Sequence, residues 1–210
     1  MRVSEFKFSA EVYRGQYNRR FASFQPMTSS LRFPFRFDPD RLKADHAAIM
    51  ASDWVRHYNS TMYEGDWSAV PLRSIGGELR QIFPDPAARN FAPTEILRRS
   101  PYFQEVLATF QCPLLAARLL RLKAGSSIRE HTDYKLAFED GELRVHVPIH
   151  TSDRVEFYVA GERVILAEGE AWYVNTSLPH RVANLGDTDR IHLVIDCEVD
   201  DWLRSFFPPQ

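Results

Sequence analysis

Hydrophobic and polar residues alternate through short segments in the second half of this 210-residue chain. A period of two residues is typical of strands that bury one face. Turn-forming pairs such as Asp140-Gly141 and Ala160-Gly161 separate these segments. The pattern predicts strands at residues 115–123, 142–150, 154–160, 162–167, 170–175, 180–185 and 189–196. Strands that follow one another without intervening helices indicate a β-sandwich or barrel, of which the jelly roll is one form.

Helical spacing dominates the chain before residue 112. Asp38 followed by Pro39 predicts a helix start, because an acidic N-cap and a proline at the first helical position both favour one. Ser100 followed by Pro101 predicts a second start. The apolar residues expected to continue the first helix are Leu42, Ile49, Met50 and Trp54.

The first 37 residues or so are expected to be extended and to add an edge strand. This segment contains alternating phenylalanines, Phe33, Phe35 and Phe37. We expect a single domain over residues 1–210, in which a mixed extended and helical layer (1–111) supports a β core (112–200) and the helices pack outside it.

Composition and charge do not suggest a nucleic-acid or membrane partner. The formal net charge is −2 and the pI is about 6.4, without a basic stripe. No apolar run approaches the ~18 residues of a membrane span, and the N-terminus lacks the apolar segment of a signal peptide. Cys112 and Cys197 form no CxxC motif and are expected to be reduced thiols. We therefore expect a cytoplasmic protein and leave its oligomeric state open.

Two histidines and an aspartate are candidate metal ligands. His131 and Asp133 lie two residues apart, so in an extended segment they share a face. With His180 they supply the two imidazoles and one carboxylate that hold non-haem Fe(II) while leaving positions open for substrate and O₂. The interval before His180 leaves room for the strands of a closed double-stranded β-helix. A histidine two residues from an aspartate is weak evidence alone, since most such histidines are ordinary surface or core residues.

Arg190 is a candidate carboxylate-binding residue, because a guanidinium matches the geometry of a carboxylate. If Gly186-Asp187 centres a hairpin, residue 183 faces residue 190, and Arg190 lies roughly 10 Å from His180 along the ladder. A dicarboxylate held by the metal at one end could then reach Arg190 with the other. Taken alone, Arg190 would be interpreted as a surface residue at a hairpin end.

The predicted strand 142–150 has a polar face that carries Arg144 and His146. The simplest interpretation is a face exposed to water. In a small barrel, however, such a face can line a ligand cavity, where both side chains could donate to an anion.

Four segments of the chain resemble the aspartyl/asparaginyl β-hydroxylase-like family, which includes small bacterial hydroxylases of free proline. The segments are 118–134 (RLLRLKAGSSIREHTDY), 143–149 (LRVHVPI), 169–175 (GEAWYVN) and 180–196 (HRVANLGDTDRIHLVID). The resemblance covers about residues 110–200 and, more loosely, 53–73. It implies a mainly β, cupin-like double-stranded β-helix as the catalytic core, with Fe(II), 2-oxoglutarate and O₂ as reactants.

The resemblance also implies roles for particular residues. The implied metal ligands are His131, Asp133 and His180. Arg190 matches the residue that holds the distal carboxylate of 2-oxoglutarate, and Arg144 and His146 match supporting contacts. Animal members that modify proteins carry glycine at the position of Asp133, so its presence is more similar to the small-molecule branch.

We therefore expect a dioxygenase that hydroxylates an aliphatic C–H bond of a free amino acid or a small amino-acid derivative. The candidate substrate contacts are Arg118, Arg121, Arg129 and Tyr134. Alternation puts one of Arg118 and Arg121 inside, but does not say which. Three alternatives remain: a hydroxylase of Asp, Asn or another side chain in a peptide or protein, a cupin-type metalloenzyme that does not use 2-oxoglutarate, and a non-catalytic binding module.

Overall fold

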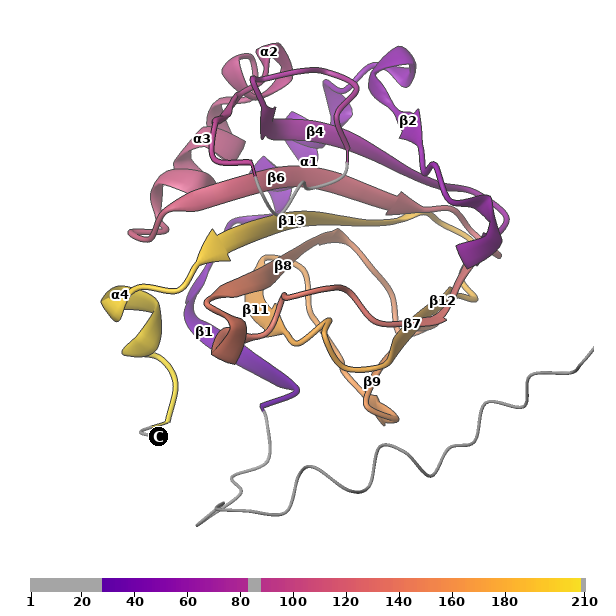
Figure 1. The fold of residues 1–210 in the computed structure, drawn as a ribbon. Coiled ribbons are helices and arrows are strands. Elements are labelled where there is room, and N and C mark those ends of the chain that lie inside the picture. Colours follow the sequence, from indigo (N-terminus) through magenta and orange to yellow (C-terminus); the bar gives the residue numbers. More distant parts are fainter. Residues whose placement is uncertain (1–27, 83–87, 209–210) are drawn as a thin grey trace, which may run out of the picture.

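Two antiparallel sheets make up most of the computed structural model, which describes residues 28–82 and 88–208 (Figure 1). The larger sheet has eight strands, seven of them in the order β1-β11-β8-β13-β6-β4-β2, with β5 paired to β4. Its strands are β1 (Ser30–Arg36), β2 (Val55–Arg56), β4 (Trp67–Ile75), β5 (Phe91–Pro93), β6 (Leu114–Leu122), β8 (Glu142–His150), β11 (Glu170–Val174) and β13 (Arg190–Glu198). The mainly β architecture predicted from the alternation is confirmed, and so is the jelly-roll core that the family resemblance implied.

The smaller sheet has five strands in the order β10-β9-β12-β7-β3. These are β3 (Tyr63–Glu64), β7 (Ser127–His131), β9 (Val155–Val159), β10 (Glu162–Arg163) and β12 (His180–Asn184). Helices α1 to α3 lie on the opposite side of the larger sheet from the smaller one (Figure 1). The α-helices are α1 (Pro39–Ala47), α2 (Glu95–Arg98), α3 (Pro101–Ala108) and α4 (Asp201–Arg204), and the 3₁₀ helices are η2 (Ala51–Asp53), η3 (Ser60–Met62) and η4 (Phe138–Asp140).

Both predicted helix starts are confirmed. The side chain of Asp38 accepts hydrogen bonds from the first backbone N–H groups of α1, and Pro101 is the first residue of α3. Helix α1 is shorter than expected because it ends at Ala47, so Ile49 and Trp54 lie beyond it. No helix in the described ranges is long and apolar enough to cross a membrane.

The central strands β8, β13 and β6 present different chemistry on their two faces. On the helix side, Val147 of β8 and Leu193 of β13 pack with Phe103 of α3 in the larger hydrophobic cluster. Facing the smaller sheet, the alternate positions carry buried polar groups, among them Arg144 and Arg190. The polar face predicted for residues 142–150 therefore lies between the sheets instead of in water.

The predicted edge strand is confirmed in part, because within the described residues β1 pairs with β11 alone and lies at one end of the larger sheet. The rest of that prediction falls on residues 1–27, which lie outside the described residues. The single-domain organisation and its division at residue 112 also stay predictions.

Three expectations about the strands differ from the structure. The strand expected at residues 162–167 is limited to β10 (Glu162–Arg163). Strand β4, in the region where helices were expected to dominate, pairs with β6 inside the larger sheet. It is buried at nearly every position, so it lacks the alternation that identifies half-buried strands. In addition, β12 and β13 do not form a hairpin: β12 pairs with β7 and β9, whereas β13 pairs with β6 and β8. The loop between them carries the chain from one sheet to the other, because each strand buries its apolar side against a different layer.

Candidate metal centre

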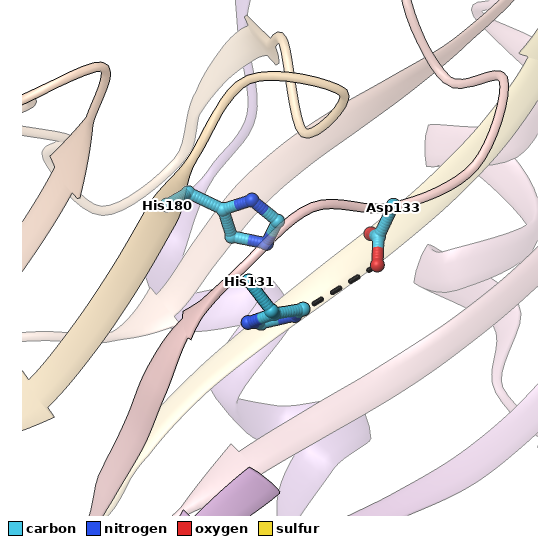
Figure 2. Close-up of side chains that lie close together, drawn as sticks. All are labelled: His131, Asp133 and His180. Atoms are coloured by element: carbon cyan, nitrogen blue, oxygen red, sulfur yellow. Dashed lines mark ion pairs between the residues drawn. The ribbon is translucent and has the colours of Figure 1, made fainter. Parts of the chain in front are cut away.

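His131, Asp133 and His180 converge at the end of the smaller sheet (Figure 2). His131 is the last residue of β7 and His180 the first of β12, and the two are direct partners across this antiparallel pair. Asp133 follows β7 by two residues, and its backbone N–H donates to the carbonyl of Thr176 at 2.8 Å. One ligand atom from each of the three lies within 4.8 Å of the others, and Nε2 of His131 is 3.8 Å from Oδ1 of Asp133.

Backbone carbonyls orient both imidazoles. Nδ1 of His131 lies 2.8 Å from the carbonyl oxygen of Arg129, and Nδ1 of His180 lies 3.0 Å from that of Leu178. A carbonyl only accepts, so each Nδ1 must carry the hydrogen, and in the neutral ring Nε2 then has the free lone pair. Burial also lowers the pKa of His180 to about 4, which keeps this ring neutral. Both histidines therefore present Nε2, and not Nδ1, toward the candidate metal position.

Asp133 is held by an arginine on the side away from the two histidines. Its Oδ2 contacts Nη1 of Arg144, which comes from β8. Burial raises the pKa of Asp133, but Arg144 and the two histidines outweigh burial and hold the pKa below its usual value. The carboxylate is thus ionised, with one oxygen on the arginine side and the other on the histidine side.

Arg190, the first residue of β13, is a buried cation without a carboxylate partner among the described residues. Its side chain is enclosed, with the residue only 2% exposed; Nη2 lies 3.0 Å from Nδ1 of His192, and Nε has no hydrogen-bond partner. Burial lowers the pKa of Arg190 to about 9, so the group is still charged at neutral pH. An uncompensated buried charge is costly, and a bound anion would offset this cost.

A cavity of about 330 Å³ joins Arg190 to the three candidate ligands. Arg118, Arg144, His146 and Tyr134 also line this cavity, as their predicted roles require. Its apolar wall includes Ala69, Leu120, Ile128, Phe157 and Val182. The volume is at the lower end of the range of about 300–1,000 Å³ typical of small-molecule sites.

Two of the expected substrate contacts are not among the cavity residues. Arg121 packs its guanidinium 4.1 Å over the ring of Trp54 and donates to the Ser68 hydroxyl. Arg129 donates to Glu64 on the surface. Arg118, by contrast, faces the cavity, which decides the choice that alternation left open.

The sequence interpretation missed several residues of this cavity. His57 lies parallel to Trp67 with ring centroids 3.7 Å apart, and both line the wall. His192 and Asp196 are not among the residues that line the cavity, but they lie on the same face of β13 as Arg190. The alternation within β13 could have identified the last two, because they follow Arg190 at intervals of two residues.

The fold and this cluster together define a jelly-roll protein with a His/Asp/His metal-binding arrangement between its sheets. Residues 38–199 match the family model "Aspartyl/Asparaginyl beta-hydroxylase", and the chain belongs to this family.

Individual proteins are also similar to this chain. The chain is 28% identical over 176 residues to an L-proline cis-4-hydroxylase of Rhizobium meliloti (strain 1021); the match covers 81% of this chain and 61% of that protein, so the chain spans less than two thirds of this relative's length. HygX from Streptomyces hygroscopicus, solved with nickel and 2-oxoglutarate bound, has a similar fold at 13% identity, with a TM-score of 0.53 over 83% of this chain and 84% of that one. An oxidoreductase of the 2OG-Fe(II) oxygenase family from Burkholderia pseudomallei aligns at 18% identity and a TM-score of 0.50, covering 80% of this chain and 85% of that one.

Proposed function

We propose that this protein is an Fe(II)- and 2-oxoglutarate-dependent dioxygenase that hydroxylates an aliphatic C–H bond of a free amino acid or a small amino-acid derivative. The observation that carries the proposal is Arg190, a buried and uncompensated cation in the same cavity as the His/Asp/His cluster. A metal site alone does not require such a cation, whereas a dicarboxylate bound to the metal by its other end would neutralise it. Membership of the hydroxylase family supports the same chemistry.

The three candidate ligands fit Fe(II) by their donor set. Nε2 of His131, Nε2 of His180 and one oxygen of Asp133 would hold the ion, and such a set leaves further coordination positions open. When bound, Fe(II) and 2-oxoglutarate supply the oxidation of an unactivated C–H bond by O₂. The residues of the chain fix the ligands and surround the reacting groups with a cavity that is apolar over much of its wall.

Arg190 would bind the distal carboxylate of 2-oxoglutarate through a charge-assisted hydrogen bond. His146, which is buried and has no hydrogen-bond partner at Nε2, would supply a second polar contact in the same part of the cavity. Arg144 has its Nε, Nη1 and Nη2 atoms engaged by Asp133 and Asp196. Its role in this proposal is therefore to hold Asp133, in place of the direct co-substrate contact expected from the sequence.

A small substrate suits the cavity volume and the similarity to an enzyme named for its action on L-proline. Arg118 and Tyr134 are the substrate contacts we retain, because both line the cavity. A cation is suited to a substrate carboxylate, while Tyr134, 72% exposed, lies at the solvent side. A cytoplasmic location also stays a prediction.

Three alternative functions make different demands on the site. A hydroxylase of Asp or Asn side chains in a peptide would need a cavity open to a bulky chain. A metalloenzyme that does not use 2-oxoglutarate would leave Arg190 without a ligand. A binding module without catalysis would not need the orienting hydrogen bonds on Nδ1 of His131 and His180.

The proposal is tested by anaerobic titration of the Fe(II)-loaded protein with 2-oxoglutarate. We expect a visible charge-transfer absorption that saturates with 2-oxoglutarate and is absent when Zn(II) replaces Fe(II). Free amino acids and matched short peptides are then compared for stimulation of succinate release, and we expect stimulation by a free amino acid. No absorption change and no succinate release with any substrate would refute the dioxygenase assignment.

A further inference from the structure

Asp196 is a buried carboxylate between two arginines behind the candidate metal centre. It lies on β13 and is 2% exposed. Across the β13–β8 pair its Cα partner is Arg144, and on the other side β6 places Arg118 opposite Val194. Three adjacent strands thus bring two cations and one anion together on the face that lines the cavity.

The contacts of Asp196 fix the orientation of Arg144. Oδ1 of Asp196 accepts from Nε of Arg144 at 2.7 Å, and Oδ2 accepts from Nη2 of Arg144 at 3.2 Å. This two-point contact holds the planar guanidinium by one edge. The remaining terminal nitrogen, Nη1, is then directed at Oδ2 of Asp133.

The charges of this cluster balance only with Asp196 ionised. Arg118 donates to Oδ2 of Asp196 at 3.0 Å, so Asp196 separates the two buried guanidiniums that would otherwise repel each other. Burial raises the pKa of Asp196, but Arg118 and Arg144 outweigh burial and bring the pKa below its usual value. Together with Asp133 the cluster contains two cations and two anions.

We propose that Asp196 is a positioning residue of the metal centre, which acts through Arg144 to hold Oδ2 of Asp133 and leave only Oδ1 to coordinate. Oδ1 is the oxygen that lies 3.8 Å from Nε2 of His131. A carboxylate held in this way occupies one coordination position instead of two, which keeps positions available for co-substrate and O₂. This inference rests on the proposed metal-binding role of His131, Asp133 and His180.

The test uses Co(II) as the probe, because its visible spectrum reports the coordination number without turnover. We expect Asp196→Asn to bind Co(II) about 10- to 100-fold more weakly than the wild type, with an altered visible spectrum. The control is Asp189→Asn, which changes an aspartate 37% exposed at the side chain and outside the cavity, and which should bind Co(II) as the wild type does. A double-mutant cycle with Arg144→Gln should be strongly non-additive, since Asp196 acts through that residue.

Circular dichroism checks that each variant is folded. If Asp196→Asn does not fold, the charge-balanced Arg118→Gln/Asp196→Asn variant replaces it, with the same expected loss of Co(II) affinity. A folded variant with wild-type Co(II) affinity and spectrum overturns the role of Asp196 and leaves the proposed function intact. Failure of the wild type itself to bind Co(II) overturns both.

Discussion

His131 and His180 are direct partners across the β7–β12 pair, and their ring centroids lie 4.2 Å apart. The pairing shifts register immediately after His180, so the regular ladder is interrupted at the candidate metal centre. Irregularities of this kind often re-aim a side chain next to a site. Backbone pairing and the two carbonyl contacts at Nδ1 therefore hold both imidazoles before any metal arrives.

This arrangement predicts that metal stabilises the protein through these ligands. At a free Co(II) concentration about 100 times the dissociation constant, the free energy of unfolding should rise by about 2.7 kcal/mol. His180→Gln should abolish most of this gain, whereas His150→Gln, which lies outside the cavity, should keep it. Thermal unfolding with and without Co(II) measures this stabilisation in the wild type and in each variant. An equal shift in His180→Gln and the wild type would exclude His180 as a ligand.

Arg190→Ala should weaken 2-oxoglutarate binding and leave the metal affinity within about two-fold of the wild type. A hydrogen bond to a charged group contributes about 1.5–3 kcal/mol, which corresponds to a rise of about 10- to 150-fold in the 2-oxoglutarate requirement. Arg121→Ala is the matched control, because this arginine lies outside the cavity. Anaerobic titration and the concentration dependence of succinate release are the measurements. Equal 2-oxoglutarate affinity in both variants would refute the assignment of Arg190.

Arg190 should lower the stability of the ligand-free protein. Folding buries the Arg190 charge without an anion, so Arg190→Met should raise the free energy of unfolding by about 1 kcal/mol. Arg118→Met should instead lower it, because Asp196 loses a partner in a buried ion pair. Urea unfolding in the presence of a chelator compares the two. A destabilised Arg190→Met would show that the contacts of the arginine outweigh its desolvation.

The carbonyl oxygen of Gly169 accepts a hydrogen bond from the N–H of Phe37, the residue after β1, and a side chain at Gly169 should be poorly tolerated. Its φ is +76°, and a Cβ would lie 2.2 Å from the carbonyl oxygen of Phe37. Gly161 also has a positive φ, +82°, but a Cβ there would have nothing within 4 Å. Gly161→Ala should therefore cost only the backbone strain, about 1 kcal/mol, and Gly169→Ala clearly more. Similar urea midpoints for the two variants would contradict this account.

The His46–His150 pair predicts a loss of stability in mild acid. Nε2 of His150 lies 3.2 Å from Nδ1 of His46, and burial, followed by the neighbouring His150, lowers the pKa of His46 to about 4. In the unfolded chain His46 binds a proton near pH 6.5, whereas in the folded protein it does so only near pH 4. Its contribution to the free energy of unfolding is therefore complete above pH 6.5 and is lost as the pH falls toward 4. Chelator-treated His46→Gln should show a flatter pH dependence of the urea midpoint. The same slope as the wild type would assign the acid sensitivity to other groups.

Sequence patterns found most of the β core because most of its strands after residue 112 alternate and end at turn residues. They missed β4, since burial on both faces removes the alternation. The helix predicted after Asp38 was extended too far, because Ile49 and Trp54, which lie beyond Ala47, pack against the core without being part of the helix.

The three candidate ligands do lie together, and their metal-binding role stays a prediction. For Arg190 the predicted geometry was wrong. Spacing placed His131 and Asp133 on one face, which is a local property of extended chain. The hairpin that was expected to bring Arg190 near His180 does not exist, and the two strands reach the cavity from different sheets. Local spacing cannot reveal which sheet a strand joins.

The sequence by itself determined most of the strands after residue 112, the candidate metal ligands and the presence of an arginine suited to a carboxylate, because these depend on side-chain chemistry and on local periodicity. Only the tertiary structure decided that Arg190 is buried without an anion among residues 28–82 and 88–208, whereas Arg118 and Arg144 share Asp196. The reason is physical: the energy of a charge depends on which groups replace water around it, and those groups are brought together by strands far apart in the chain.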